Sequence, residues 1–344
     1  MTVMNAGSEA LVAPYDILLF DLDGVLYVGD APVDHAAAAV NHCRSELSKP
    51  VAFITNNASR TPDAVVAKLV AAGVAAQAED VVTSAQAAAH LLSDQHPQGS
   101  AILIIGGEGL VDAVRAVGLR PVRSDADGPV AVVQGFHPDV NWRMLAEAAA
   151  AVNRGVPWVA TNRDMTIPTA SGIAPGNGTL VAAVQVATGQ EPTTVGKPEP
   201  PLILEALRRT GTSRPLLIGD RMDTDIQAAF ATGSDSLMVL TGVNGPLDYC
   251  LAPPEQRPTY LARDLRALLV PASVVDVAEG QWSCAGWRAE SGDDGGLSLT
   301  TRGPDPLDGI RVLAAGCWQN IDQGAVPTAK TLAMIEELAA TLED

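Results

Sequence analysis

Two aspartates separated by one residue follow a short apolar segment near the start of the chain. Asp21 and Asp23 stand in Asp21-Leu22-Asp23-Gly24-Val25, directly after Ile17–Phe20. Residues two apart in an extended chain face the same side, and Gly24 permits a sharp backbone turn. Neighbouring carboxylates repel one another unless a cation is present, and a set of oxygen ligands suits Mg²⁺. The pair therefore points to a metal site, although two loop acids that only cap backbone groups would show the same spacing.

Two later motifs offer groups that can hold a phosphate. Thr55-Asn56-Asn57 follows the apolar residues 51–54 and supplies a hydroxyl, two amides and backbone N–H groups. Gly196-Lys197-Pro198 supplies an ammonium group, which binds phosphate as a point charge. A plain polar turn and a surface lysine are the ordinary explanations, and for either motif taken alone they are preferred.

A second group of acids lies in Gly219-Asp220-Arg221-Met222-Asp223-Thr224-Asp225. The apolar residues 216–218 predict a strand that ends at Asp220, and the next helix is expected from about Thr224. Asp225 can stabilise the start of that helix through the helix dipole, a role compatible with one near a metal. The acids that could converge on one cation are then Asp21, Asp23, Asp220 and Asp225.

The elements that must position these residues alternate between short apolar segments and helices. Such alternation predicts a parallel sheet wound with helices on both faces, an α/β fold. The polar motifs follow the carboxyl ends of strands, where open α/β sheets bind their ligands. Strands are expected at residues 17–20, 51–54, 81–83, 102–105, 130–133, 156–160, 216–218 and 237–240, and helices at residues 35–47, 110–117, 141–152, 179–188, 201–210 and 224–232.

Local signals mark where several helices begin. Asp34 is the expected N-cap of the helix that starts at residue 35, and Ser84 is the expected cap of the helix after residues 81–83. Thr61-Pro62-Asp63 combines a cap, a proline in the first turn and an acid, which predicts another helix that ends before Gly73.

The composition changes after about residue 270. Tryptophans become frequent, and residues 291–296 are rich in turn formers. We expect a small appended domain with a few antiparallel strands and then a helix at residues 328–342.

The net charge of −18, from 22 basic and 40 acidic residues in a chain of 344, disfavours nucleic acid and anionic membranes as partners. The four cysteines lie far apart without a CxxC pair, so free thiols in a reducing compartment are expected. Residues 1–16 lack the basic start of a secretory signal, and no apolar run is long enough to cross a membrane. We expect a cytoplasmic protein.

The order of the motifs resembles that of the haloacid dehalogenase-like (HAD) phosphohydrolases over roughly residues 15–265. The order is DxDG, a strand-terminal threonine, a lysine and then GDxxxTD. Within this family, the nitrophenylphosphatase branch is similar at residues 21–27, 54–60, 161–164, 175–178 and 219–225. The layout also resembles that of actinobacterial glycerol 3-phosphate phosphatases, which carry a short C-terminal domain likened to part of an acetyltransferase fold. The tail has no identifiable acyl-CoA loop, so acetyl transfer is not expected.

The resemblance implies a reaction through a phosphorylated aspartate. Asp21 is the nucleophile, and Asp23 is the general acid and then the general base. Mg²⁺ is held by Asp21, the backbone carbonyl of Asp23, and Asp220. Asp225 orients a metal-bound water or the lysine.

The resemblance also implies which residues bind the substrate. The phosphate oxygens are assigned to Thr55, Asn56, Asn57 and Lys197. Asn162 and Asp164 are candidates for contacts to the leaving group, although a turn with local capping explains this pair about as well. Glycerol 3-phosphate is the leading substrate, and pyridoxal phosphate, phosphoglycolate and a mononucleotide remain open.

The branch inserts an α/β cap domain between the threonine and lysine motifs. The expected division is a HAD core at residues 1–85, the cap at 86–187, the rest of the core at 188–268, and a small α+β domain of unknown role at 269–344. Caps of this branch often support dimers, so a homodimer is possible.

Competing functions give different predictions. A haloacid dehalogenase has no need of Asp23, and a phosphomutase would carry its cap directly after Asp23. A phospho-accepting signalling module also uses an aspartate, Mg²⁺, a threonine and a lysine, but it is shorter and lacks a late pair such as Asp220 and Asp225. A chromogenic phosphate ester, tested with and without Mg²⁺, would separate an enzyme from such a module or from an inactive binding scaffold.

Overall fold

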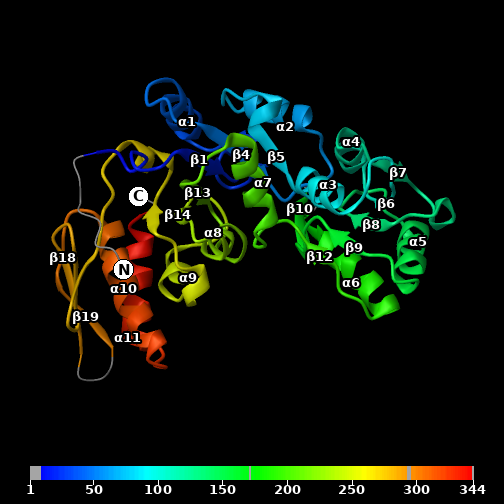
Figure 1. Cartoon of the computed structure of the whole chain (residues 1–344). Coiled ribbons are helices and arrows are strands. Elements are labelled where there is room, and N and C mark those ends of the chain that lie inside the picture. The colour runs from blue at the N-terminus through cyan, green and yellow to red at the C-terminus, as the bar shows by residue number, and fades with distance from the viewer. Residues whose placement is uncertain (1–8, 170–171, 293–295, 343–344) are drawn as a thin grey trace. The chain divides into compact units, whose positions relative to one another are not determined.

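The computed structural model describes residues 9–169, 172–292 and 296–342, and these form two compact units (Figure 1). The first unit contains the described residues up to Val51, residues 72–74 and the described residues from Ser213 onward. The second contains residues 52–71 and 75–212.

The first unit contains four parallel strands, which lie in the order β15, β14, β13, β1. Their central residues are almost completely buried, as expected for a parallel sheet that is covered on both faces. The elements here are β1 (Ile17–Phe20), β13 (Pro215–Gly219), β14 (Asp235–Val239), β15 (Tyr260–Ala262), the hairpin of β2 (Tyr27–Val28) and β3 (Ala31–Pro32), α1 (Ala36–Ser45), a π-helix (Met222–Ile226), α8 (Gln227–Thr232) and α9 (Pro246–Cys250).

The tail of the chain completes the first unit with an antiparallel sheet and two helices. The sheet has the order β16 (Asp276–Ala278), β17 (Gln281–Cys284), β18 (Trp287–Ser291), β19 (Leu297–Thr301). The helices are α10 (Pro306–Asp322) and α11 (Ala329–Ala340). The strands and the last helix agree with prediction. The turn expected at residues 291–296 lies partly outside the described residues, at 293–295.

Helix α10 was not predicted, because two glycines interrupt its pattern and glycine disfavours a helix interior. Tertiary packing explains both. A Cβ at Gly309 would lie 2.8 Å from the Trp287 ring, and one at Gly316 would lie 2.7 Å from Leu297. The glycines let α10 approach the antiparallel sheet closely, and burial against that sheet outweighs the propensity cost.

The second unit contains a parallel pair of strands and a separate five-stranded parallel sheet. The pair is β4 (Val51–Thr55) and β5 (Val81–Thr83), which are accompanied by α2 (Pro62–Ala71), α3 (Ser84–Gln95) and α7 (Pro201–Thr210). The larger sheet has the order β12 (Thr193–Thr194), β9 (Trp158–Ala160), β8 (Ala131–Gln134), β6 (Ala101–Ile105), β7 (Arg120–Val122).

Helices pack on the five-stranded sheet through alanine and valine side chains. One core cluster joins Leu103 and Ile105 of β6 to Ala148 of α5 and Val181 of α6. The helices are α4 (Glu108–Ala116), α5 (Trp142–Asn153) and α6 (Asn177–Thr188), and a hairpin of β10 (Thr166–Thr169) and β11 (Gly172–Pro175) precedes α6. The short strands β7, β12, β10 and β11 were not predicted, because two to four residues carry too little periodicity. Short 3₁₀ helices occur at Ala78–Asp80, Asp125–Asp127, Pro254–Gln256 and Leu265–Leu269.

Two of the predicted helix caps are wrong. The N-cap of α1 is His35, in a left-handed conformation and without a side-chain cap, so Asp34 has no capping role there. The N-cap of α3 is Thr83, whose side chain forms a capping box with Gln86, and Ser84 is already helical. Thr61 does accept a hydrogen bond from the Ala64 N–H at the start of α2, as predicted. A cap depends on backbone angles, which adjacent polar residues in a sequence do not distinguish.

The α/β class predicted from the sequence is confirmed by these sheets and their helices. Among the described residues, no helix is both long and apolar enough to cross a membrane.

Candidate active site

Three aspartates of the first unit bring their carboxylates together. One oxygen from each of Asp21, Asp220 and Asp225 lies within 4.8 Å of the others. Asp21 is partly buried and follows β1, whereas Asp220 and Asp225 are only 1% and 2% exposed. Burial in a low-dielectric interior makes mutual repulsion costly, so such a cluster calls for a positive charge. Oxygen donors at this spacing fit a hard divalent cation such as Mg²⁺ or Ca²⁺.

Three glycines lie against these carboxylates, at positions where any side chain would clash with them. A Cβ added to Gly24 would lie 2.4 Å from Asp220 Oδ2, and one on Gly242 would lie 2.0 Å from the same atom. Gly24 also has a φ of +82°, which other residues rarely adopt. A Cβ on Gly219 would meet the Asp225 side chain at 2.2 Å. Side chains at these positions would displace the carboxylates, so the glycines make the cluster possible.

The loop after β14, which includes Gly242, also forms hydrogen bonds with Asp220. The Val243 N–H donates to Asp220 Oδ2 at 2.7 Å, and the Asn244 N–H donates to the Asp220 carbonyl at 3.3 Å. The Asn244 side chain accepts a hydrogen bond from the Met222 N–H at 2.9 Å. In the same loop, the Thr241 hydroxyl donates to the Gly24 carbonyl at 2.6 Å. The loop therefore joins both acidic motifs.

Asp225 and Asp23 differ in their surroundings. Asp225 lies in the π-helix that replaces the first turn of the helix expected from residue 224, and it accepts a hydrogen bond from the Arg221 N–H at 3.1 Å. That turn brings its carboxylate into the cluster. Asp23 is exposed on the turn after β1, and its carboxylate is not a member of the cluster. The metal contact expected of Asp23 involves its backbone carbonyl and stays a prediction.

In the second unit, Asn56 connects three segments that are far apart in the sequence. Its Nδ2 donates to the Lys197 carbonyl at 2.9 Å, and its Oδ1 accepts from the Lys197 N–H at 2.8 Å. Its backbone carbonyl accepts hydrogen bonds from Ser84 Oγ at 2.6 Å and from Asn162 Nδ2 at 2.7 Å. A Cβ on Gly196 would lie 2.6 Å from Asn56 Oδ1, so glycine is required beside it. Asn56 thus fixes the backbone on which Lys197 stands.

The two residues considered for leaving-group contacts belong to the same network. Asn162 is buried, and its Oδ1 accepts from the Asp164 N–H at 3.1 Å, which is the local capping expected for a turn. Asp164 accepts a hydrogen bond from Asn56 Nδ2 at 3.3 Å. The Asn177 side chain donates to the Asn162 carbonyl at 2.8 Å. Asn162 is therefore occupied within the protein, and Asp164 is the more accessible of the two.

The remaining phosphate-binding candidates are Thr55, Asn57 and Lys197. Thr55 is buried at the end of β4, and its hydroxyl accepts a hydrogen bond from the Asn57 N–H at 3.1 Å. The exposed Asn57 uses its Oδ1 on the N–H and hydroxyl of Ser59. Lys197 is buried, which is unusual for a lysine without a functional or ionic role.

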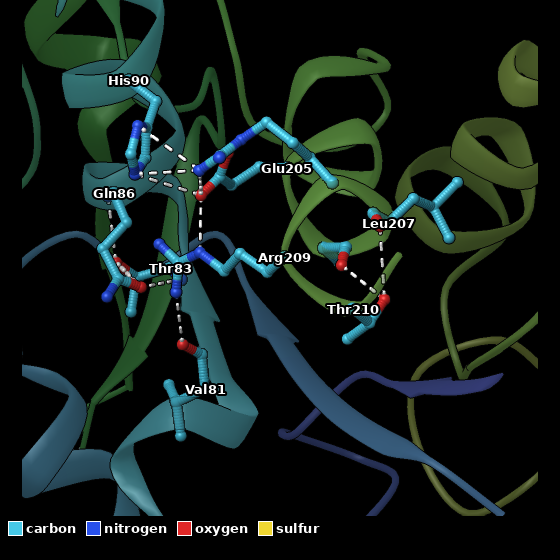
Figure 2. A network of polar contacts seen from close by, with 10 residues as sticks. Val81, Thr83, Gln86, His90, Glu205, Leu207, Arg209 and Thr210 are labelled. Carbon is cyan, nitrogen blue, oxygen red and sulfur yellow. Dashed lines mark hydrogen bonds and ion pairs between the residues drawn. The ribbon is translucent and has the colours of Figure 1, made fainter. Parts of the chain in front are cut away.

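An ion-pair network centred on the buried Glu205 joins α7 to α3 and β5 in the second unit (Figure 2). Glu205 of α7 is 5% exposed and is bonded by Arg208 and Arg209 of the same helix, with His90 of α3 3.3 Å away. The Arg209 guanidinium also donates to the Val81 carbonyl at 3.2 Å, which joins α7 to β5. Burial raises the pKa of Glu205, but the hydrogen bonds from Arg208 and Arg209 outweigh it and leave the pKa below its usual value. The network connects the helices that follow Lys197 and Thr83.

Sequence reasoning missed the residues that hold the site from a distance. Gly242, Val243 and Asn244 lie in a loop without an identifiable motif, and Ser84 was interpreted only as a cap. The signal that could have found this loop is the pair Gly245 and Pro246, because a proline in the first turn predicts a helix start directly after the loop.

Comparison with known protein families matches most of the chain. A model of the haloacid dehalogenase-like hydrolases matches residues 18–120, and a HAD-hydrolase-like model matches residues 194–268. A model of a GCN5-related N-acetyltransferase-like domain matches residues 284–339.

Similar proteins are phosphatases. A D-glycerol 3-phosphate phosphatase of Mycobacterium tuberculosis is 44% identical over 319 residues, which is 90% of this chain and 88% of the relative. An acid sugar phosphatase of Staphylococcus saprophyticus is 35% identical over 74% of this chain and 97% of its own length. These relatives do not support a signalling module or scaffold without turnover.

Solved structures agree with this relationship. A glycerol phosphate phosphatase from M. tuberculosis in complex with calcium has a TM-score of 0.86 at 41% identity and covers 96% of this chain and 98% of its own. The magnesium complex of that phosphatase has a TM-score of 0.81. A p-nitrophenyl phosphatase from Archaeoglobus fulgidus, at 28% identity, has a TM-score of 0.69 and covers 74% of this chain and 98% of its own. With its acidic cluster, its motif order and these relatives, the chain belongs to the haloacid dehalogenase-like hydrolases, and it is a phosphatase of that family.

Proposed function

We propose that the enzyme hydrolyses glycerol 3-phosphate through a phosphorylated Asp21 and depends on Mg²⁺. The observation that carries the catalytic part is the convergence of the Asp21, Asp220 and Asp225 carboxylates within 4.8 Å, although Asp21 and Asp220 stand 199 positions apart in the chain. The substrate is supported by the 44% identical glycerol 3-phosphate phosphatase, which this chain matches along nearly its whole length.

The proposed reaction has two displacements at phosphorus. An Asp21 carboxylate oxygen attacks phosphorus while the bond to the glycerol oxygen breaks, and Asp23 gives its proton to the departing alkoxide. Asp23 then accepts a proton from water as the water oxygen attacks phosphorus. The bond to Asp21 breaks, inorganic phosphate leaves, and both aspartates return to their starting states. The exposed position of Asp23 beside the strand end suits exchange of its proton with solvent.

We propose Asp21, the Asp23 carbonyl and Asp220 as the residues that would hold Mg²⁺, with Asp225 behind them. When bound, Mg²⁺ would neutralise negative charge that builds up on the phosphoryl group. The glycines beside Asp220 and the Val243 N–H keep Asp220 in one orientation without the metal, which lowers the cost of ordering the ligands.

For phosphate oxygens we propose Thr55 and Lys197, with a contribution from the backbone at Asn56 and Asn57. The side chain of Asn56 is engaged with Lys197, which supports a positioning role for it. Of the two leaving-group candidates, we favour Asp164 for a glycerol hydroxyl, and Asn162 as the residue that orients Asp164 through its N–H.

We further propose the predicted domain division, with one adjustment. Strand β12 at residues 193–194 pairs with β9 in the five-stranded sheet, so the cap would run from about residue 86 to 194 rather than to 187. The four cysteines are buried free thiols, which supports the proposal of a cytoplasmic enzyme. A homodimer stays a prediction.

A phosphate-release screen tests the substrate. The purified chain would be assayed with Mg²⁺ against both enantiomers of glycerol 3-phosphate, phosphoglycolate, pyridoxal phosphate, a sugar phosphate and a mononucleotide, ranked by kcat/KM. We expect one glycerol 3-phosphate enantiomer to rank first. A tenfold higher kcat/KM for any other compound would overturn the substrate assignment and leave the mechanism standing. The Asp21→Asn variant, assayed alongside, tests the mechanism itself.

A further inference from the structure

The C-terminal domain shares a hydrophobic core with the elements that carry the metal motif. One buried cluster contains Met222 and Ile226 of the π-helix, Tyr249 of α9, and Trp282 and Ile310 of the C-terminal domain. Met222 and Ile226 flank Asp225 within the same π-helix. The tail is thus part of the packing beneath the acidic cluster and not a separate module of the first unit.

Helix α9 is the element through which the C-terminal domain reaches this region. It packs against both α10 and α11 (Figure 1). The indole N–H of Trp318 in α10 donates to the Tyr249 carbonyl at 2.9 Å, and the two rings meet edge to face with centroids 5.0 Å apart. Four residues after Tyr249 stands Pro253, which has no N–H to continue the helical hydrogen bonding. The Tyr249 carbonyl accepts the Ala252 N–H at 3.3 Å, and the Trp318 indole is its second and shorter donor.

The other end of α9 holds the loop that bonds Asp220. Asp248 Oδ2 accepts from the Gly245 N–H at 2.9 Å and from Asn244 Nδ2 at 3.1 Å. Asn244 in turn accepts from the Met222 N–H, and its neighbour Val243 donates to Asp220 Oδ2. A continuous set of contacts therefore runs from Trp318 through α9 and the loop to the carboxylate of Asp220.

We propose that the C-terminal domain positions the metal centre: α10 fixes α9, and α9 fixes the loop that orients Asp220. Trp318, Asp248 and Asn244 are then positioning residues for the metal. This role rests on the proposed function in one respect, because it takes Asp220 as a metal ligand. A domain that matches an acetyltransferase-like model would thus contribute to phosphate hydrolysis by rigidity alone.

Metal binding by the intact full-length chain tests the proposal directly. Dissociation constants for Mg²⁺ and for Ca²⁺ would be measured by calorimetry without substrate. Trp318→Phe removes the hydrogen bond to Tyr249, and Asp248→Ala, at an exposed position, removes the contacts to the loop. We expect each variant to bind metal about three- to tenfold more weakly, the range for one or two lost hydrogen bonds. The KM for substrate at saturating metal should not change.

Two controls isolate the path through α9. Arg302→Ala breaks an exposed ion pair with Glu337 inside the C-terminal domain, and Trp142→Phe makes the same substitution at a 79% exposed tryptophan of α5. Both should keep the parent metal affinity. The double variant of Trp318→Phe with Asn244→Ala should lose less than the product of the two single losses, since both act on one path.

The outcomes separate this proposal from the function on which it rests. If Asp220→Asn binds metal like the parent, the proposed metal site is wrong. If Asp220→Asn loses the metal while Trp318→Phe and Asp248→Ala retain parent affinity, only the positioning role is overturned, even where their melting temperatures fall. Hydrogen exchange at residues 241–248 gives a second readout. It should accelerate in Trp318→Phe, and unchanged exchange would contradict the proposal.

Discussion

The acidic cluster of the first unit and the Asn56 network of the second are built in opposite ways. The cluster brings like charges together, and glycines and backbone N–H groups hold them. The Asn56 network is held by an amide that satisfies backbone groups of distant segments, and it carries one buried lysine. The first arrangement suits a cation and the second an anion. A phosphatase needs both, and the contrast predicts that substitutions will separate metal affinity from phosphate affinity.

The largest effect should come from Asp21→Asn, which removes the nucleophile. Loss of a nucleophile that acts together with its partners costs at least about 10⁴-fold in kcat. Circular dichroism and the melting temperature should show an intact fold, because Asn has nearly the same shape. Single-turnover assays would detect any residual reaction. Near-normal rates would exclude Asp21 as the group that bonds to phosphorus.

Asp220→Asn should act on the metal and spare the phosphate. We expect the Mg²⁺ concentration for half-maximal activity to rise by about 10- to 100-fold, comparable to the loss on mutating groups around bound metals. Excess Mg²⁺ should recover part of the rate, and the KM for substrate at that concentration should stay near the parent value. A raised KM with unchanged metal dependence would contradict the proposal that Asp220 binds the metal and not the phosphate.

Asn56→Ala should show the converse pattern. Lys197 would lose the two hydrogen bonds that fix its backbone, and a displaced donor costs about 10²–10³-fold in kcat. The metal dependence should not change. Asn57→Ala is the matched comparison, because the Asn57 side chain bonds only Ser59 among the described hydrogen bonds. An equal loss in both variants would point instead to direct phosphate contacts by the two side chains.

The smallest effect on catalysis, but a clear one on stability, is expected for Glu205→Gln. Removing the charge that Arg208 and Arg209 bond should lower the free energy of unfolding by about 1–3 kcal/mol at pH 7. The folded-state pKa of Glu205 is lowered, so its contribution is present above the unfolded pKa of about 4.3 and is lost as pH falls below it.

Chemical denaturation of the Glu205→Gln variant and the parent between pH 7 and pH 3 would measure this. The difference in unfolding free energy should shrink as the pH falls through about 4.3. A difference that is constant over this range would mean that packing, and not charge, accounts for the role of Glu205. An enhanced difference at low pH would contradict the sign of the pKa shift.

The elements that the sequence predicts well are those with a strong local pattern. Helix α7 has the predicted bounds, and β1, β4, β6 and β13 agree to within one residue at each end. Helix α10, the hairpin of β10 and β11, and the caps of α1 and α3 were missed or wrong. In each of these cases a non-local contact or a backbone angle outweighs residue preference.

By itself, the sequence determined which chemical groups are available and in what order strands deliver them, because apolar periodicity and strand-end motifs are local properties. Only the tertiary structure decided how those groups are held. Val243 bonds Asp220 from 23 positions away, Asn56 bonds Lys197 across 141, and Trp318 bonds Tyr249 across 69. Such partners depend on which strands become neighbours and on how closely glycines let backbones approach. Neither feature can be inferred from a short segment of the sequence.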